Sequence, residues 1–231
     1  MSECKMESFQ DLNLNQGSPI RLSNFVGGDF VACIESDNTT WIDSLDPRTG
    51  SVIAQVPCSQ PKDVEAAILA AQNAFPAWSK TTRAQRSSYL RRISELLHEH
   101  REILAVWESA DQGKPLERAR IEVDRAIANF SYFSTFILHE QTAARVIDGA
   151  NILTYEHRSP RGVFALISPW NMPLYLLTWK IAPCLAFGCT AVAKPSEITS
   201  ISAYRMFCLF LFYCPSDPQK LTTLSSPCEF D

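Results

Sequence analysis

The spacing of apolar and polar positions divides the chain into a strand region, a helical region and a second pair of strands. Short apolar runs between residues 26 and 57, interrupted by Gly27-Gly28 and Asp46-Pro47, predict short strands. Apolar residues then recur three and four positions apart, which predicts three amphipathic helices. The helices are marked by Val64, Ala67, Ile68, Ala71 and Phe75, by Leu90, Ile93, Leu97 and Leu104, and by Ala126, Phe130, Phe133 and Ile137.

Residues that begin and end helices agree with this division. Asp63 stands near the start of the first helix, and Gly113 stands where a left-handed cap would end the second. Residues 143–157 alternate loosely, which predicts a β-hairpin. The first 20 residues are polar, and we expect them to be disordered.

The stretch after the hairpin predicts a strand, a helix and a strand joined by short connections. Val163–Ile167 is apolar and flanked by Gly162 and Ser168, as in a strand buried on both faces, and residues 190–193 predict a second buried strand. Strand, helix and strand in this order form a right-handed βαβ unit of an α/β fold. The helix between them is marked by Pro173 at its first turn, by Leu174, Leu177, Ile181 and Leu185 along it, and by Gly188 at its end.

Two polar turns, residues 168–171 and 194–197, follow these strands at the carboxyl ends, where open α/β sheets bind ligands. Glu197 can accept hydrogen bonds from both hydroxyls of a ribose, and Lys194 supplies a cationic donor beside it. The carboxylate favours NAD over NADP, although the lysine weakens that preference. The Asn171 amide can donate to a developing oxyanion. The alternative is a merely rigid turn with solvated ions, but both motifs about 23 residues apart across one βαβ unit favour the cofactor site.

These motifs resemble those of the aldehyde dehydrogenases. Residues 24–30 are similar to the opening strand pair of that family, residues 46–50 to its first turn, and Pro115 follows its third helix in the usual place. The likeness extends over about residues 22–205. Within the superfamily, residues 168–183 are most similar to the eighth class, the 2-aminomuconic semialdehyde dehydrogenases.

The resemblance implies an α/β fold: an opening segment of helices and strands, then the first βαβ of an incomplete Rossmann-like NAD-binding domain. It divides the chain into a disordered start (1–20), the first part of that domain (21–142), an oligomerisation-type hairpin (143–157), the βαβ unit (158–205) and a tail foreign to the family (206–231). The hairpin pairs with a neighbouring subunit in the family, which implies a homo-oligomer.

The implied activity is NAD-dependent oxidation of an aldehyde to the carboxylic acid, with an acid-bearing semialdehyde as substrate. Asn171 then stabilises the oxyanion, and Arg125 matches the position where the eighth class keeps an arginine for the substrate carboxylate, a group that suits a guanidinium fork. The alternative for Arg125 is an exposed ion pair with Glu122 or Asp124. The implied NAD-binding residues are Ile167, Ser168, Pro169, Trp170, Lys194, Pro195, Ser196 and Glu197.

The sequence after Arg205 departs from the family pattern. Residues 206–214 form an apolar run that is too short to span a bilayer, and a Pro/Ser/Thr-rich tail follows it. As a helix this run would be apolar on every side, and we expect it to have nothing to bury against. We expect this segment to come from intron read-through or an incorrect gene model. The run also adds a β-prone window.

Parts of the family's catalytic machinery have no counterpart in the 231 residues: the phosphate-side turn, the nucleophilic cysteine and the general base. We therefore expect an inactive chain with weak NAD affinity. Because the βαβ unit would leave a sheet edge uncovered, we also expect poor solubility and no independent folding. The alternative function is a non-catalytic subunit that associates with full-length partners or is degraded.

Composition narrows the remaining classes. The chain is 46% hydrophobic and 20% charged with a net charge of −4, which favours a cytoplasmic globular protein without nucleic-acid or membrane partners. Its eight cysteines are irregularly spaced, which favours reduced thiols, with Cys184 and Cys189 in the core. His98 and His100 lie on different helix faces, and we expect them to be solvated, so no metal site is predicted.

Overall fold

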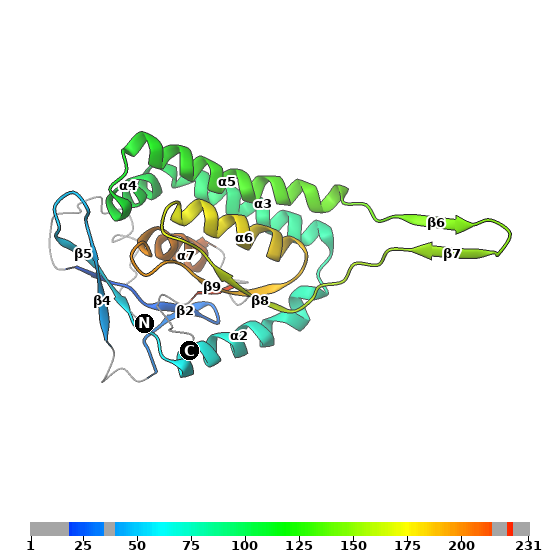
Figure 1. The fold of residues 1–231 in the computed structure, drawn as a ribbon, viewed down its shortest axis with the longest axis horizontal. Coiled ribbons are helices and arrows are strands. Elements are labelled where there is room, and N and C mark those ends of the chain that lie inside the picture. The colour runs from blue at the N-terminus through cyan, green and yellow to red at the C-terminus, as the bar shows by residue number, and fades with distance from the viewer. Residues whose placement is uncertain (1–18, 35–39, 214–220, 224–231) are drawn as a thin grey trace.

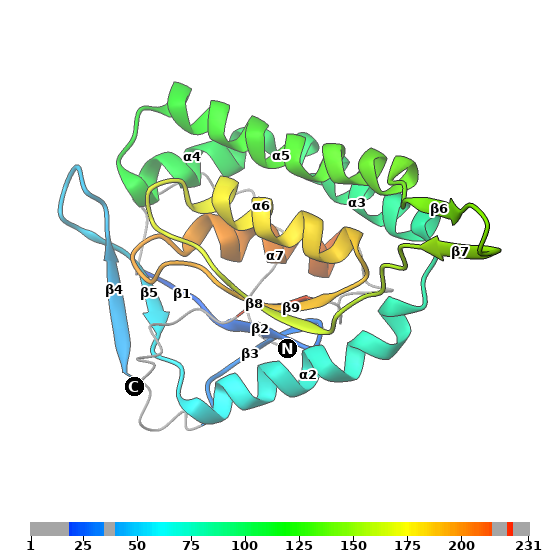
Figure 2. The ribbon, with the colours of Figure 1, turned by 45° about the vertical axis from the view of Figure 1, so that its right-hand side comes forward.

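The protein is a layered α/β structure with a projecting hairpin (Figure 1). The computed structural model describes residues 19–34, 40–213 and 221–223. Helix α2 (Pro61–Ser79) covers one face of a five-stranded sheet, and α6 (Pro173–Ala186) and α7 (Ile201–Tyr213) cover the other (Figure 2). Helices α3 (Arg83–Glu99), α4 (Arg101–Gln112) and α5 (Leu116–His139) form an outer layer over α6 and α7. The predicted α/β fold is confirmed.

The five-stranded sheet has the order β3-β2-β10-β9-β8. Strands β8 (Val163–Ile167), β9 (Thr190–Lys194) and β10 (Leu221–Thr223) run parallel, and β2 (Asn24–Val26) pairs antiparallel with β10. The turn from β2 to β3 (Asp29–Val31) is made by Gly27 and Gly28 at φ angles of 64° and 96°, which side chains disfavour.

A second sheet places β5 (Val52–Pro57) between β1 (Ile20–Arg21) and β4 (Trp41–Leu45). Its buried side chains Leu22, Ala54 and Val56 form one cluster with Trp107 of α4 and Ile201 of α7. The sheet therefore packs against α4 and the start of α7. Of the 20 residues predicted to be disordered, residues 1–18 lie outside the described part, and Ile20 already belongs to β1.

The helical region contains four helices where the periodicity predicts three. The predicted first and third helices are α2 and α5. The predicted second helix is wrong as a single element, because the chain breaks at His100, whose φ and ψ are −107° and 19°. The break is stabilised on both sides: the His100 N–H donates to Leu96 O, and its carbonyl accepts from Leu104 N.

The predicted caps are present. Asp63 at the third position of α2 accepts a hydrogen bond from the Gln60 N–H at 2.7 Å, as in a capping box. Gly113 ends α4 in the left-handed conformation at φ 73°, and its N–H donates to Ser109 O at 2.8 Å.

The predicted βαβ unit is β8, α6 and β9, with Pro173 in the first turn of α6. Strand β9 is buried as expected. Strand β8 is not buried on both faces: it is the edge of the sheet, and Phe164 and Ile167 are 42% and 55% exposed. An apolar run identifies the strand but does not show which neighbours cover it.

Two expectations about the end of the chain are wrong. The apolar run from residue 206 does find a core to bury against, because it is the second half of α7, and Met206, Phe207, Cys208, Leu209 and Phe210 are buried. The Phe207 ring lies 5.2 Å from that of Phe25 in β2. Strand β9 is likewise no open edge, since β10 pairs with it in parallel. Cys214 lies outside the described residues.

The hairpin predicted at residues 143–157 is confirmed as β6 (Ala144–Ile147) and β7 (Ile152–Tyr155), which pair antiparallel. It extends away from the layers (Figure 1). Every residue of both strands is exposed.

Candidate active site at the carboxyl edge of β8 and β9

The two predicted polar turns lie side by side. Strands β8 and β9 pair in a register that sets Ile167 opposite Lys194. One residue later the Ser168 N–H donates to the Lys194 carbonyl at 3.0 Å, so the pairing continues into the turns. The parallel strands therefore deliver residues 168–171 and 194–197 to one edge of the sheet, where α/β folds bind ligands.

The first turn combines exposed side chains with one buried hydroxyl. Ile167 and Trp170 are 55% and 56% exposed, and Pro169 and Asn171 are also exposed. The Ser168 hydroxyl is buried and has no hydrogen-bond partner among the described residues. The Asn171 side-chain amide likewise makes no hydrogen bond to any described residue. Its N–H is therefore available to an oxygen atom of a ligand.

The second turn holds an ion pair between half-buried groups. The Lys194 ammonium donates to the Pro195 carbonyl at 3.3 Å and to the Glu197 carboxylate at 3.4 Å. Pro195 and Ser196 are buried, and the Ser196 carbonyl accepts the Ser200 hydroxyl at 2.7 Å. Pro195 and Ser196 thus shape the turn, while Lys194 and Glu197 present the charges.

The donor set of the second turn fits an adenosine ribose of NAD. An ammonium has three N–H donors and a carboxylate has about four acceptor sites, so the single contact between Lys194 and Glu197 leaves capacity on both groups. Hydroxyl pairs are bound by such neighbouring donors and acceptors.

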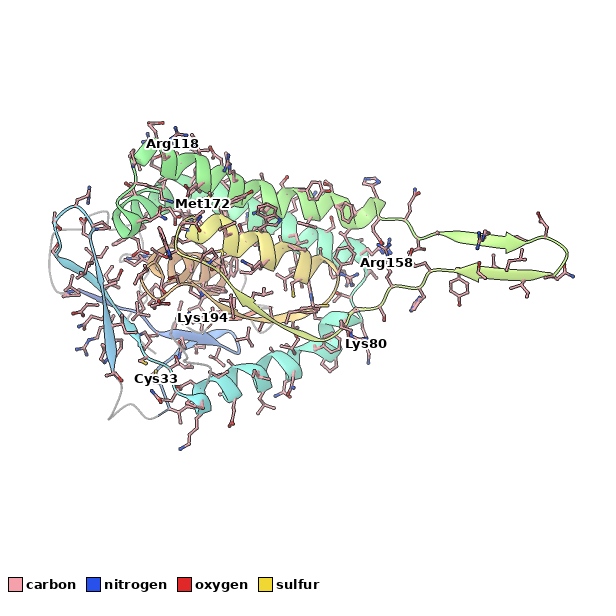
Figure 3. The ribbon with its side chains drawn as sticks, in the orientation of Figure 1. Cys33, Lys80, Arg118, Arg158, Met172 and Lys194 are labelled. Atoms are coloured by element: carbon pink, nitrogen blue, oxygen red, sulfur yellow. The ribbon has the colours of Figure 1, made fainter. Side chains whose placement is uncertain are left out.

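The end of α4 contacts the first turn and the start of α7. The Gln112 amide donates to the Trp170 carbonyl at 2.7 Å and to the Asn171 carbonyl. Asp111 accepts from the Ser44 hydroxyl at 3.0 Å and from the Ile201 N–H, the first of α7, at 2.9 Å. Figure 3 shows Met172, the residue after Asn171, near the α4–α5 junction where Arg118 lies.

Asp111 belongs to a buried charged cluster. Burial raises its pKa to about 7, and burial also raises the pKa of Glu108, which is fully buried. The Lys114 ammonium lies 3.4 Å from Glu108 and also contacts Glu122. The lysine charge offsets part of the cost of burying these carboxylates.

Arg125 lies on α5, facing the first turn of α6. Its guanidinium carbon is 5.5 Å from the centre of the Tyr175 ring. The alternative of an ion pair with Glu122 or Asp124 is wrong, because Glu122 binds Lys114 and Asp124 is engaged by Arg101. Within the described residues the Arg125 guanidinium has no carboxylate partner, so it is free to bind one from a ligand.

Other reactive side chains do not join the site. His98 is exposed as expected, but His100 is half-buried at the α3–α4 break, and burial lowers its pKa. Burial raises the pKa of the Cys184 thiol to about 12, which keeps it protonated and unreactive. Cys184 and Cys189 form no disulfide within the described residues. No group of three or more candidate metal ligands occurs in the ranges that the structure describes.

Sequence reasoning missed Asp111, Gln112 and Tyr175 as parts of the site. The first two were visible only as the residues before a helix-ending glycine. The available signal was their position: both polar side chains stand in the last turn of a helix, where they can contact other segments. Tyr175 lies four residues after Asn171, in the first turn of α6.

Comparison with known proteins identifies the relatives of this site. The family model described as "Aldehyde dehydrogenase family" matches residues 33–212, beyond the point at Arg205 where we expected the likeness to end. The chain belongs to the aldehyde dehydrogenase family. It is 46% identical over 192 residues to the 2-aminomuconic semialdehyde dehydrogenase of Bos taurus, which covers 83% of the chain and 38% of that relative. It is 38% identical over 180 residues to an aldehyde dehydrogenase of Vibrio cholerae, covering 78% and 35% respectively.

Solved structures of aldehyde dehydrogenases share the fold. The betaine aldehyde dehydrogenase of Staphylococcus aureus in complex with NAD⁺ aligns with a TM-score of 0.82 at 31% identity, covering 94% of this chain and 42% of that one. The chain thus spans about two fifths of the length of the relatives that it matches. None of the helices in the described ranges has the length and apolarity to cross a membrane.

Proposed function

We propose that this chain supplies the NAD- and aldehyde-binding residues of a dehydrogenase that oxidises an acid-bearing semialdehyde, of the kind named in its bovine relative. One observation carries the proposal: the β8–β9 register brings the Asn171 turn and the Lys194–Glu197 turn to one edge of the sheet. Family membership supports aldehyde oxidation, and the S. aureus neighbour was solved with NAD⁺ bound.

Each residue has a role that its surroundings support. Glu197 accepts hydrogen bonds from a ribose, and Lys194 donates to it. The buried Pro195 and Ser196 hold this turn in shape. The first turn binds the cofactor through Ile167, Ser168, Pro169 and Trp170. The Asn171 amide donates to the aldehyde oxygen as negative charge develops on it. NAD, when bound, accepts the hydride.

Arg125 supports an acid-bearing substrate. Its guanidinium lies against the ring of Tyr175, in the first turn of α6 and four residues after Asn171, and no described carboxylate binds it. The ring orients the planar fork without neutralising its charge. A substrate with a carboxylate remote from its aldehyde carbon therefore fits the pair Asn171 and Arg125.

A chimera tests this function without depending on the length of the chain. Residues 33–212 would replace the matching segment of the bovine 2-aminomuconic semialdehyde dehydrogenase, hereafter the bovine chimera. We expect NAD-dependent NADH formation with 2-aminomuconic semialdehyde. A correctly folded, inactive bovine chimera would contradict the proposal. The purified 231-residue chain, assayed in parallel, should form no NADH, as expected from the sequence.

A second candidate, a non-catalytic subunit that docks on full-length partners, is favoured by the hairpin. Val146, Leu153 and Tyr155 are 65%, 61% and 71% exposed. Exposed strands with large apolar side chains favour pairing with another chain, which would cover them. The hairpin would then pair with another subunit, and the chain would form a homo-oligomer. Size-exclusion chromatography with light scattering should show association that is lost in the double variant Val146→Asp and Leu153→Asp. A monomeric unmodified chain that does not bind the bovine relative would contradict this docking.

A further inference from the structure

The side chain of Gln112 bridges the last turn of α4 and the turn that carries Asn171. Its amide nitrogen donates to two successive carbonyls, those of Trp170 and Asn171, which lie 58 and 59 residues further along the chain. Two bonds from one amide fix the orientation of two consecutive peptide groups. A turn held only at its ends would leave these peptide groups free to rotate.

Gln112 itself is presented from a fixed base. The neighbouring Asp111 is 2% exposed, and its two oxygens bind the Ser44 hydroxyl and the first N–H of α7. On the other side, the Ser109 hydroxyl donates to the Lys114 carbonyl at 2.7 Å and closes the end of the helix. The position of the Gln112 amide therefore follows from α4 packing against β4 and α7.

The Asn171 side chain depends on this support. Because its amide makes no hydrogen bond to the described residues, its direction is set by its own backbone, and that backbone is held through the carbonyl that Gln112 binds. We propose that Gln112 is a positioning residue, which fixes the Asn171 amide where the aldehyde oxygen will lie. The inference rests on the proposed function for the role of Asn171, but the bond itself can be tested without catalysis.

Chymotrypsin cleavage after Trp170 reports directly on the bond. The protease must bind the Trp170 carbonyl, the atom that Gln112 holds, and Trp170 is 56% exposed. The 231-residue chain and its variants Gln112→Ala and Gln112→Glu would be digested, with fragments quantified by mass spectrometry. Glutamate keeps the volume of glutamine, but when ionised its side chain has no hydrogen-bond donor. Gln72→Ala, at an exposed position of α2, is the matched control.

The cleavage rate at Trp170 is divided by the rate at Tyr155, which is 71% exposed on the hairpin. We expect this ratio to rise roughly tenfold in both Gln112 variants, because each loses two hydrogen bonds, and to stay unchanged in Gln72→Ala. An unchanged ratio in Gln112→Glu would overturn the inference. New cleavage at the buried Phe130 would also overturn it, because Gln112 would then support the whole fold.

Kinetics separate positioning from binding. In the bovine chimera, Gln112→Glu should lower kcat about tenfold and leave the KM for NAD unchanged, as expected for an interaction needed only in the transition state. An inactive unmodified chimera would contradict the proposed function and leave the cleavage ratio as the test of Gln112. A raised KM for NAD with an unchanged kcat in Gln112→Glu would overturn the positioning role.

Discussion

At the scale of single residues, the proposed function assigns the choice of cofactor to the Lys194–Glu197 pair. In the bovine chimera, Glu197→Gln should weaken NAD binding and relax discrimination against NADP, because the neutral amide no longer repels a 2′-phosphate. Titration calorimetry with both cofactors measures the two affinities. If the ratio of affinities did not change, Glu197 would not contact the ribose.

Gly113 combines a special backbone conformation with a close contact. Its φ is 73°, and a Cβ atom there would lie 2.9 Å from Pro47 Cβ. Gly149 of the hairpin has a similar φ of 77° with no atom near its Cβ position, so it is the matched control. We expect Gly113→Ala to lower the free energy of unfolding by about 2–3 kcal/mol and Gly149→Ala by about 1 kcal/mol, measured by urea denaturation. Equal losses would show that the Pro47 contact relaxes freely.

At the scale of elements, the α4–α7 junction makes stability depend on pH. Burial raises the pKa of Asp111 from 3.8 to about 7, so between these values the folded protein holds a proton that the unfolded chain has released. Stability therefore falls as pH rises from about 4 to 7, by at most about 1.4 kcal/mol per pH unit. The buried Glu108 contributes in the same direction, while the nearby Lys114 opposes both shifts.

The variant Asp111→Asn isolates the part due to Asp111. Its amide oxygen can still accept from the Ile201 N–H, and its amide nitrogen can donate to the Ser44 hydroxyl, whose own proton can turn to the Ile198 carbonyl. We expect urea denaturation at pH 5, 6 and 7 to show a smaller decline in stability for the variant. A decline as steep as that of the unmodified chain would mean that Asp111 is already ionised at pH 5.

The sequence predicted secondary structure correctly where a residue type favours one local backbone conformation. Gly113 and Pro173 marked helix ends correctly, and the alternation at residues 143–157 gave the hairpin. It failed where packing decides. Periodicity continued through His100 although the chain bends there, and the same apolar pattern described the exposed β8 and the buried β9.

The candidate site was predicted in the same uneven way. Asn171, Lys194 and Glu197 stand in short motifs directly after strands, so sequence alone placed them at one edge of a sheet. The bridge from Gln112 could not be predicted, because it joins segments 58 residues apart through backbone carbonyls, which carry no sequence signal. The burial of Met206 and Phe207 in α7 likewise depends on the tertiary core.

At the scale of the whole molecule, the proposed function requires the outer helical layer and the sheet to form one site together. Helix α5 supplies Arg125, α4 supplies Gln112, and the sheet edge supplies Asn171 and Glu197. If these segments form one aldehyde site, substrate preference should depend on Arg125, although it lies on a different layer from the sheet.

The central claim is tested most directly by measuring kcat/KM of the bovine chimera for two substrates, 2-aminomuconic semialdehyde and the neutral aldehyde propanal. The variant Arg125→Ala is compared with the unmodified chimera and with Arg118→Ala, a control at an exposed position. Loss of a charge-assisted hydrogen bond to the substrate carboxylate should lower kcat/KM about 10- to 100-fold for the acidic aldehyde in Arg125→Ala. The value for propanal, and both values in Arg118→Ala, should stay within about twofold of the unmodified chimera. Equal losses on both aldehydes in Arg125→Ala would contradict the account and make Arg125 a structural residue.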